Sequence, residues 1–133
     1  MSRRKAREIA FKVLFQVDQV SAEPQPAFEL LIKDERLAEK YWEFSWGLVT
    51  GCLKYLADID KRLAAYSRDW AVDRMSSVDR NIMRIAGYEI LFMGNDHAII
   101  AIDEAIEISK KYGDESSASF VNAILDRVRA EQA

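Results

Sequence analysis

The spacing of apolar residues constrains the fold of this chain more than any other feature. Apolar side chains recur three and four residues apart along most of its length, and no segment alternates apolar and polar residues over the length of a strand. The first such stripe comprises Ala6, Ile9, Ala10, Val13, Leu14 and Val17. A period near 3.6 is typical of amphipathic helices, so the sequence predicts an all-α protein of six or seven helices with short connections.

Capping and helix-breaking residues indicate where these helices begin and end. Both prolines lie in 21–26, which predicts a loop after the first helix. Ser76, followed three residues later by Asp79, resembles a capping box, and Gly94 is a typical residue just after a helix end. The first predicted helix ends at about Val20. The others cover about 27–33, 34–66, 77–93, 99–111 and 118–130. Gly47 and Gly51, four residues apart, are expected to let a neighbouring helix approach closely.

Length and composition limit the class of protein. A chain of 133 residues forms one domain, or two small halves that share a core. Its net charge of −3 and pI near 5.3 exclude a protein that coats nucleic acid indiscriminately. The single cysteine, Cys52, excludes an internal disulfide and, with a single histidine, a Cys/His zinc site within one chain. No apolar run reaches the roughly 18 residues that span a bilayer. We therefore expect a cytoplasmic protein.

Basic residues gather at the start of the first predicted helix. They are Arg3, Arg4, Lys5, Arg7 and Lys12. With Glu8 as the one acid, five positive charges and one negative give this end +4, which leaves −7 for the rest of a chain whose total is −3. Positive charge at a helix N-terminus opposes the helix dipole at a cost of about 0.3–1 kcal/mol, so stability alone would not select it. The cluster therefore predicts an anion-binding surface.

The same helix carries features that suit single-stranded RNA. Arg3, Arg4 and Arg7 share a sector beside the apolar stripe, and Phe11 and Phe15 continue along it. Arginine forks bind phosphates and aromatic rings stack on bases, although Phe11 alternatively belongs to the core. We expect Arg7→Ala to weaken RNA binding without unfolding the protein. This hypothesis requires cations that are open to solvent rather than held in ion pairs within the chain.

No segment of the sequence predicts catalysis. Asp103, Glu104 and Glu107 cluster on one helix but lack the histidine partners of a di-metal site, so we interpret them as a solvated acidic face. His97 has no nucleophile or orienting partner at a recognisable spacing. Phosphate-binding loops and catalytic motifs are absent from the sequence. The sequence predicts a binding protein rather than an enzyme, with no cofactor and no metal.

The predicted helix that ends at Met93 is apolar almost all round in its second half. Its apolar residues are Ile82, Met83, Ile85, Ala86, Tyr88, Ile90, Leu91, Phe92 and Met93. Such a helix either lies in the centre of the core, which is the commoner case, or completes its burial against a partner. Glu89 lies angularly between Ile82 and Ile85, so a central position requires a donor for its carboxylate.

Several blocks of the sequence, taken together, resemble the NusB family of bacterial transcription antitermination factors. They occur in the family's order and span Arg3 to about Val128. The blocks are Ala6-Arg7-Glu8 with Ala10 and Leu14-Phe15, Val78-Asp79-Arg80 through Met83-Arg84-Ile85-Ala86 to Tyr88-Glu89, Ala101-Ile102-Asp103-Glu104-Ala105-Ile106-Glu107, Lys110-Lys111-Tyr112-Gly113, and Phe120-Val121-Asn122. Each block is moderately specific, and all of them in register form a strong signal.

The resemblance implies both a fold and a function. It implies a single all-α domain over 1–133, made of two small packed bundles at about 1–68 and 69–131. It also implies binding of boxA-type single-stranded RNA with NusE, a small-subunit ribosomal protein, within the RNA polymerase elongation complex. The expected RNA-binding residues are Arg3, Arg4, Lys5, Arg7, Phe15, Lys110, Lys111 and Phe120. The expected NusE-facing residues are Tyr88, Glu89 and Phe92.

Two alternative functions remain open at this stage. Related helical domains occur at the front of some RNA cytosine methyltransferases, but that activity needs a separate nucleotide-binding domain for which 133 residues leave no room. The other alternative is a protein-interaction module without specific RNA binding, which includes a homodimer formed through the 78–93 helix.

Overall fold

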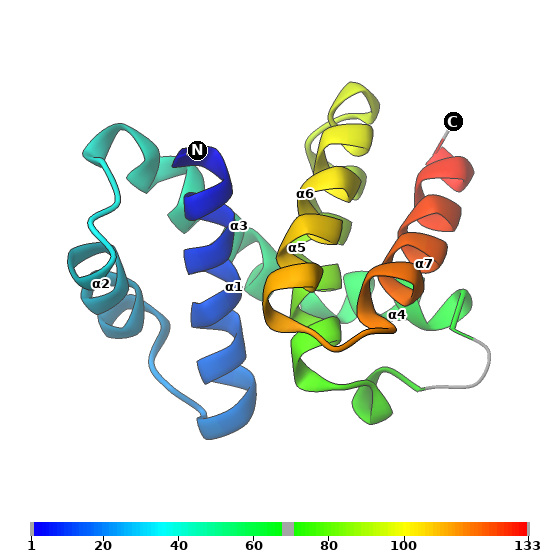
Figure 1. Ribbon diagram of the computed structural model, residues 1–133, viewed down its shortest axis with the longest axis horizontal. Coiled ribbons are helices and arrows are strands. Elements are labelled where there is room, and N and C mark those ends of the chain that lie inside the picture. Colours follow the sequence, from blue (N-terminus) through cyan, green and yellow to red (C-terminus); the bar gives the residue numbers. More distant parts are fainter. Residues whose placement is uncertain (1, 68–70, 133) are drawn as a thin grey trace.

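The structure, a computed structural model, describes residues 2–67 and 71–132, and these residues form helices joined by short connections (Figure 1). The seven α-helices are α1 (Ser2–Val20), α2 (Pro24–Asp34), α3 (Trp42–Lys54), α4 (Leu56–Ala65), α5 (Ser77–Phe92), α6 (Ala98–Tyr112) and α7 (Ser117–Gln132). Three connections contain a 3₁₀ turn, namely η1 (Glu39–Tyr41), η2 (Val72–Arg74) and η3 (Asn95–His97). The predicted all-α fold of six or seven helices is confirmed.

Helix α5 lies at the centre of the molecule. It packs against α1, α3, α4, α6 and α7, whereas α2 lies at one edge beside α1 and α3 (Figure 1). Its apolar side chains are almost fully enclosed, with 3 % or less exposed at Ile82, Met83, Ile85, Ala86 and Ile90. Burial by the chain's own helices therefore explains why most of α5 lacks a polar face.

The other helices gather on two sides of α5. Helices α1, α2 and α3 pack together on one side, and α6 and α7 pack together on the other. Helix α4 precedes residue 68 in sequence but packs chiefly against α5 and α7. The division of a single domain into halves of about 1–68 and 69–131 stays a prediction.

A network of charged side chains joins α5 to α1 and α4. Arg80 donates two hydrogen bonds to Oδ2 of Asp18, at 3.0 and 2.6 Å. Arg84 donates to both carboxylate oxygens of Asp60, at 2.9 and 2.8 Å. Between them, Asn81 donates to Asp18 and accepts from Arg84, each at 3.0 Å. Because the two guanidinium groups are satisfied within the chain, they fasten helices together instead of facing a ligand.

Two predicted helix boundaries are wrong. Helix α2 begins at Pro24, so Pro24 and Pro26 lie in its first turn and not in a loop. Proline is tolerated there because the first N–H groups of a helix have no acceptor within it. The long helix predicted over 34–66 begins only at Trp42, after η1, and is broken at Tyr55, whose φ of −108° and ψ of 22° separate α3 from α4. Neither glycine nor proline marks Tyr55, whose ring stacks on that of Phe92 at the end of α5.

The two glycines of α3 differ in their surroundings. A Cβ atom at Gly51 would lie 2.2 Å from Cζ of Tyr88, so the bare backbone of Gly51 lets the Tyr88 ring of α5 approach. At Gly47 no described atom outside its chain neighbours and its own helix backbone lies within 4 Å of the corresponding position. The predicted close approach is therefore confirmed at Gly51 and wrong at Gly47.

Both predicted ends of α5 are confirmed. The hydroxyl of Ser76 accepts a hydrogen bond from the backbone N–H of Asp79 at 3.0 Å, which makes Ser76 the N-cap. At the other end Gly94 has φ +103°, a left-handed conformation that glycine adopts without steric cost. These two residues therefore mark where α5 begins and ends.

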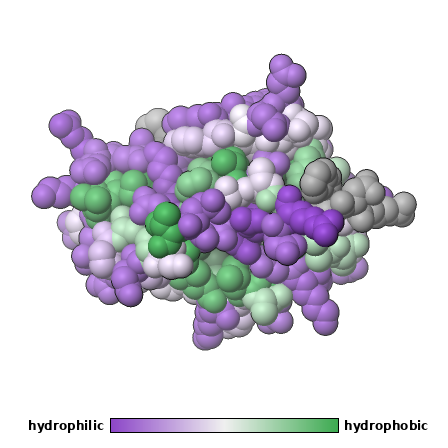
Figure 2. All heavy atoms as spheres, turned by 90° about the horizontal axis from the view of Figure 1, so that it is seen from below, coloured by the Kyte–Doolittle hydropathy of each residue, from purple (hydrophilic) through white to green (hydrophobic). Residues whose placement is uncertain are grey.

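The surface is predominantly polar on the face seen in Figure 2, where hydrophilic side chains surround separate groups of apolar ones. Within 2–67 and 71–132, each helix is either too short or too polar to cross a membrane.

Candidate nucleic-acid interface

Arg7 is buried, although the sequence predicted it on the RNA-binding face. Only 4 % of its side chain is exposed, and its Nε and Nη2 donate to the two carboxylate oxygens of Glu89 at 2.9 and 2.8 Å. An enclosed guanidinium that already binds a carboxylate in this way cannot reach a phosphate. The assignment of Arg7 as an RNA contact is therefore corrected: the side chain joins α1 to α5.

The assignment of Glu89 to the NusE-facing surface is also corrected. Its side chain is 1 % exposed, so it cannot face a protein partner. The donor that a central carboxylate requires is Arg7, 82 residues away in the sequence. Nε2 of His97 lies 3.4 Å from Oε1 of Glu89, and Oε1 of Glu104 lies 3.9 Å from Nη1 of Arg7. The buried pair therefore belongs to a charged cluster that connects α1, α5 and the start of α6.

The basic residues before Arg7 remain at the surface, where each has a neighbour from another element. Arg3 is exposed, and its guanidinium lies 4.4 Å from the centroid of the Phe44 ring. Arg4 is 42 % exposed and donates from Nε and Nη2 to the two oxygens of Glu104, at 2.9 and 2.8 Å. Arg4 is thus reachable from solvent while it is paired with a carboxylate of α6.

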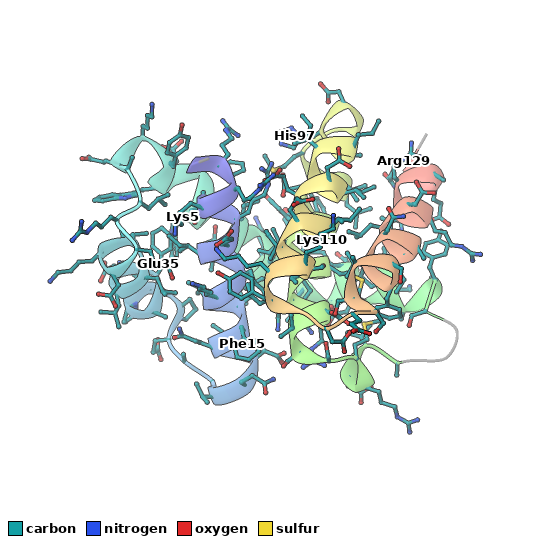
Figure 3. All side chains as sticks on the ribbon, in the orientation of Figure 1. Lys5, Phe15, Glu35, His97, Lys110 and Arg129 are labelled. Atoms are coloured by element: carbon teal, nitrogen blue, oxygen red, sulfur yellow. The ribbon has the colours of Figure 1, made fainter. Side chains whose placement is uncertain are left out.

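One carboxylate faces two lysines of α1. Glu35, just after the end of α2, lies 3.4 Å from Nζ of Lys5 and also accepts a hydrogen bond from Nζ of Lys12. Figure 3 shows Lys5 and Glu35 on neighbouring elements at the same side of the molecule. Burial raises the pKa of Glu35, but the hydrogen bonds and positive charges of Lys12 and Lys5 outweigh it and leave that pKa lowered.

Lys110 and Lys111 lie at the end of α6, and both are well exposed (Figure 3 labels Lys110). Nζ of Lys110 lies 3.4 Å from Glu107 on the same helix. Nζ of Lys111 donates to Oε1 of Glu8 at 3.0 Å, and the hydroxyl of Tyr112 donates to the same oxygen at 3.0 Å. Arg4, Lys5, Lys110 and Lys111 are therefore accessible but paired with carboxylates, whereas the RNA hypothesis required cations free of ion pairs within the chain.

Aromatic rings line a groove beside these cations. Phe11 is 4 % exposed, so its alternative assignment to the core is confirmed. Its ring centroid lies 6.1 Å from that of Phe15 and 5.4 Å from that of Tyr112. The groove is about 340 Å³ in volume and is lined by Phe11, Lys12, Phe15, Gln16, Val78 and Tyr112. Phe15 and Tyr112 are half-buried and offer ring surface next to a lysine.

A second pocket lies where η2, the start of α5 and the start of α7 meet. It is lined by Arg74, Met75, Ser76, Asp79, Asp114, Ser116, Ser119 and Phe120. Asp79 is 8 % exposed, and its Oδ1 has no hydrogen-bond partner among the described residues. A carboxylate oxygen that is buried without a donor is costly, and because Oδ1 is itself enclosed, a ligand in the pocket does not reach it. Sequence reasoning interpreted Asp79 only as part of a helix cap and missed the pocket.

The predicted protein-docking helix presents an aromatic stack. The ring of Phe92 lies 4.3 Å from that of Tyr55 and 5.5 Å from that of Tyr88, nearly parallel to both. Phe92 is 43 % exposed and Tyr88 is half-buried. Large apolar side chains around the turn from α5 to α6 are also exposed, namely Met93, Ile99 and Ile100. An exposed apolar surface of this kind is typical of a protein interface.

The ion pairs predict a loss of stability in acid. Hydrogen bonding to Arg4 lowers the pKa of Glu104, and the pKa of Glu35 is lowered as described above. A carboxyl with a lower pKa in the folded than in the unfolded chain stabilises the fold above its unfolded pKa of about 4, and this stabilisation is lost as pH falls through the folded value. Urea unfolding midpoints should therefore be similar at pH 7 and 6 and fall steadily from pH 4.5 to 3. A midpoint that stays constant over that range would contradict these pairs.

Sequence and structure comparisons place the chain among known proteins. It is 63 % identical over 132 residues to the transcription antitermination protein NusB of Syntrophomonas wolfei, which covers 99 % of this chain and 98 % of that protein. The structure of T. maritima NusB has a TM-score of 0.89 at 39 % identity and covers 98 % of this chain and 92 % of that one. A crystal structure of NusB and NusE in complex with dsRNA has a TM-score of 0.89 at 24 % identity, covers 98 % of this chain and 97 % of that one, and supports the fold alone.

The fold and its surfaces define a small all-helical binding protein. The model of the NusB family matches residues 4–130. The chain therefore belongs to the NusB family, whose curated relatives here are transcription antitermination proteins.

Proposed function

We propose that this chain is a non-enzymatic transcription antitermination factor that binds boxA-type single-stranded RNA together with NusE within the RNA polymerase elongation complex. The observation that carries the proposal is the family match over nearly the whole chain. The accessible cations at the start of α1 and the end of α6 support it, because phosphates bind where arginine and lysine side chains can reach them. The solved complex with NusE and dsRNA names the partners to test.

The proposed contacts exclude the two buried residues. The RNA-binding residues are Arg3, Arg4, Lys5, Phe15, Lys110, Lys111 and Phe120. The NusE-facing residues are Tyr88 and Phe92. Arg7 and Glu89 lie between the two surfaces and hold α1 against α5.

The pocket at Phe120 supports binding of a base as well as of phosphates. Phe120 offers a half-buried ring on which a base can stack. Arg74 at the rim supplies a positive charge for the backbone. We therefore expect this pocket to add to RNA affinity through stacking and charge, with little preference for particular bases.

Titration with RNA in the presence and absence of NusE tests the proposal. A boxA-like oligonucleotide, a scrambled oligonucleotide of equal composition and a duplex would be compared by fluorescence anisotropy. We expect the boxA-like strand to bind most tightly, and more tightly still with NusE, because two contacts on one body raise the effective affinity. Equal binding of all three RNAs, with or without NusE, would instead support a protein-interaction module. Sedimentation of the protein alone would then test self-association through the exposed surface around Phe92.

RNA affinity should fall steeply with salt. About four neutralised phosphates predict a slope of about −2 to −3 for the logarithm of the binding constant against that of the salt concentration. From 50 to 200 mM KCl this corresponds to a loss of roughly 16- to 60-fold. Anisotropy titrations at four salt concentrations measure the slope. A flat salt response would rule out phosphate binding by these cations.

A further inference from the structure

We infer that the chain's own carboxylates partly cover its cationic RNA surface, and that Glu35 and Glu104 hold RNA affinity below the level that the cations alone would give. This inference rests on the proposed function and concerns the regulation of the same surface. Both acids come from elements outside α1 and meet its basic residues across 23 to 100 positions of sequence.

Glu35 neutralises two cations at once. Its two carboxylate oxygens face Nζ of Lys5 and Nζ of Lys12, one each. The side chain is 18 % exposed and is held at the end of α2, where the backbone N–H of Glu35 bonds to the carbonyl of Leu31. Lys12 also lies 5.4 Å from the centroid of the Tyr112 ring, in the aromatic groove. A phosphate that approaches this groove therefore meets a lysine already bound to a carboxylate.

Glu104 covers Arg4 in a similar way. It accepts hydrogen bonds from Nε and Nη2 of Arg4, which is the edge that a guanidinium presents to a phosphate. Glu104 has a second cationic neighbour, because its Oε1 lies 3.9 Å from Nη1 of the buried Arg7. When a phosphate takes over the exposed Arg4, the carboxylate of Glu104 still faces a positive charge. The pair can therefore open without leaving Glu104 unpartnered.

The exposure of the cations explains why RNA can displace the carboxylates of Glu35 and Glu104. Lys5 and Arg4 are 40 % and 42 % exposed, and ion pairs between such side chains are weak in water. RNA brings several phosphates to the surface together and displaces the carboxylates, but the displaced acids remain close and repel it. The cover thus lowers affinity without abolishing it.

The test compares RNA affinity of single charge-removing variants at equal salt. Glu35→Gln and Glu104→Gln should each tighten binding of the boxA-like strand about three- to tenfold at 50 mM KCl, because each removes one repelling charge near the phosphates. The salt slope should steepen by about 0.7 for each additional phosphate contact. Glu29→Gln is the matched control, since Glu29 lies on α2, is exposed and bonds only to Gln25 among the side chains described. It should bind within about 1.5-fold of the wild type at this ionic strength.

A variant that keeps the negative charge distinguishes repulsion of RNA by Glu35 from an effect of Glu35 on packing. Glu35→Asp keeps the negative charge and should bind RNA like the wild type, whereas a purely structural role for Glu35 would make it behave like Glu35→Gln. The inference is overturned if both glutamine variants bind no more tightly than the wild type, or if Glu29→Gln gains as much as they do. The proposed function is tested separately, by whether the wild type binds the boxA-like strand more tightly than the scrambled one. Since the two acids lie on different elements, misfolding of one variant leaves the other as the test.

Discussion

Replacing Arg7 with alanine is expected to lower the free energy of unfolding by about 3–5 kcal/mol, because the substitution leaves Glu89 as a buried carboxylate without its two hydrogen bonds. In a domain of this size that loss corresponds to a fall in melting temperature of about 10–20 °C. Urea unfolding and thermal melts followed by circular dichroism at pH 7 measure both quantities. The sequence alone predicted the opposite, a loss of RNA binding with the fold intact.

Two further variants serve as controls. Arg4→Ala removes a pair that is 42 % exposed on the arginine side, so it should cost about 1 kcal/mol or less. The double variant Arg7→Met with Glu89→Leu removes both charges of this buried pair and should regain most of the lost stability. If Arg7→Ala melts like the wild type and loses RNA affinity, Arg7 faces RNA in solution and the buried pair is refuted.

Replacing Phe92 with alanine should weaken NusE binding by about 2 kcal/mol, roughly thirtyfold, with little change in folding stability. Phe92 stacks on both Tyr55 and Tyr88, so its loss removes the centre of the exposed aromatic surface. Large aromatic side chains in the middle of an interface commonly carry most of its binding energy. Isothermal titration of NusE into each variant, together with a melting curve, measures both effects.

Leu30→Ala is the matched control for Phe92→Ala. Leu30 is 60 % exposed on α2, away from the aromatic stack, and its truncation should leave NusE affinity unchanged. An equal loss in both variants would indicate a general change in the protein. If Phe92→Ala binds NusE as tightly as the wild type, NusE binds at another surface.

The fold was largely predictable because helical spacing is a local property. The stripe of α1, the Ser76 cap and the end of α5 at Gly94 each depend on residues within one or two turns. The break at Tyr55 was not predictable, since its neighbours are ordinary helix residues and no local signal marks it. Local signals thus identify the helices better than they identify where packing interrupts them.

The surfaces were predictable only in part. The basic cluster and the need for a donor to Glu89 followed from spacing and charge. Arg7 lies at the border of the apolar stripe, where periodicity does not decide between core and surface. Its burial depends on Glu89, 82 residues away, and a single sequence gives no sign of that contact. The surroundings of the unpaired Asp79 oxygen likewise depend on α7, which is distant in the sequence, so they cannot be predicted from local spacing.

The central position of α5 has a consequence for synthesis on the ribosome. Helices α1, α2 and α3 leave the exit tunnel first and can begin to associate with one another, but the flanks of α1 and α3 that pack on α5 stay uncovered until Phe92 has emerged. Until then the nascent chain exposes apolar stripes that chaperones recognise. Completion of α5 therefore covers the flanks of α1 and α3, whereas the side of α5 that packs on α6 and α7 stays exposed until those two helices have emerged.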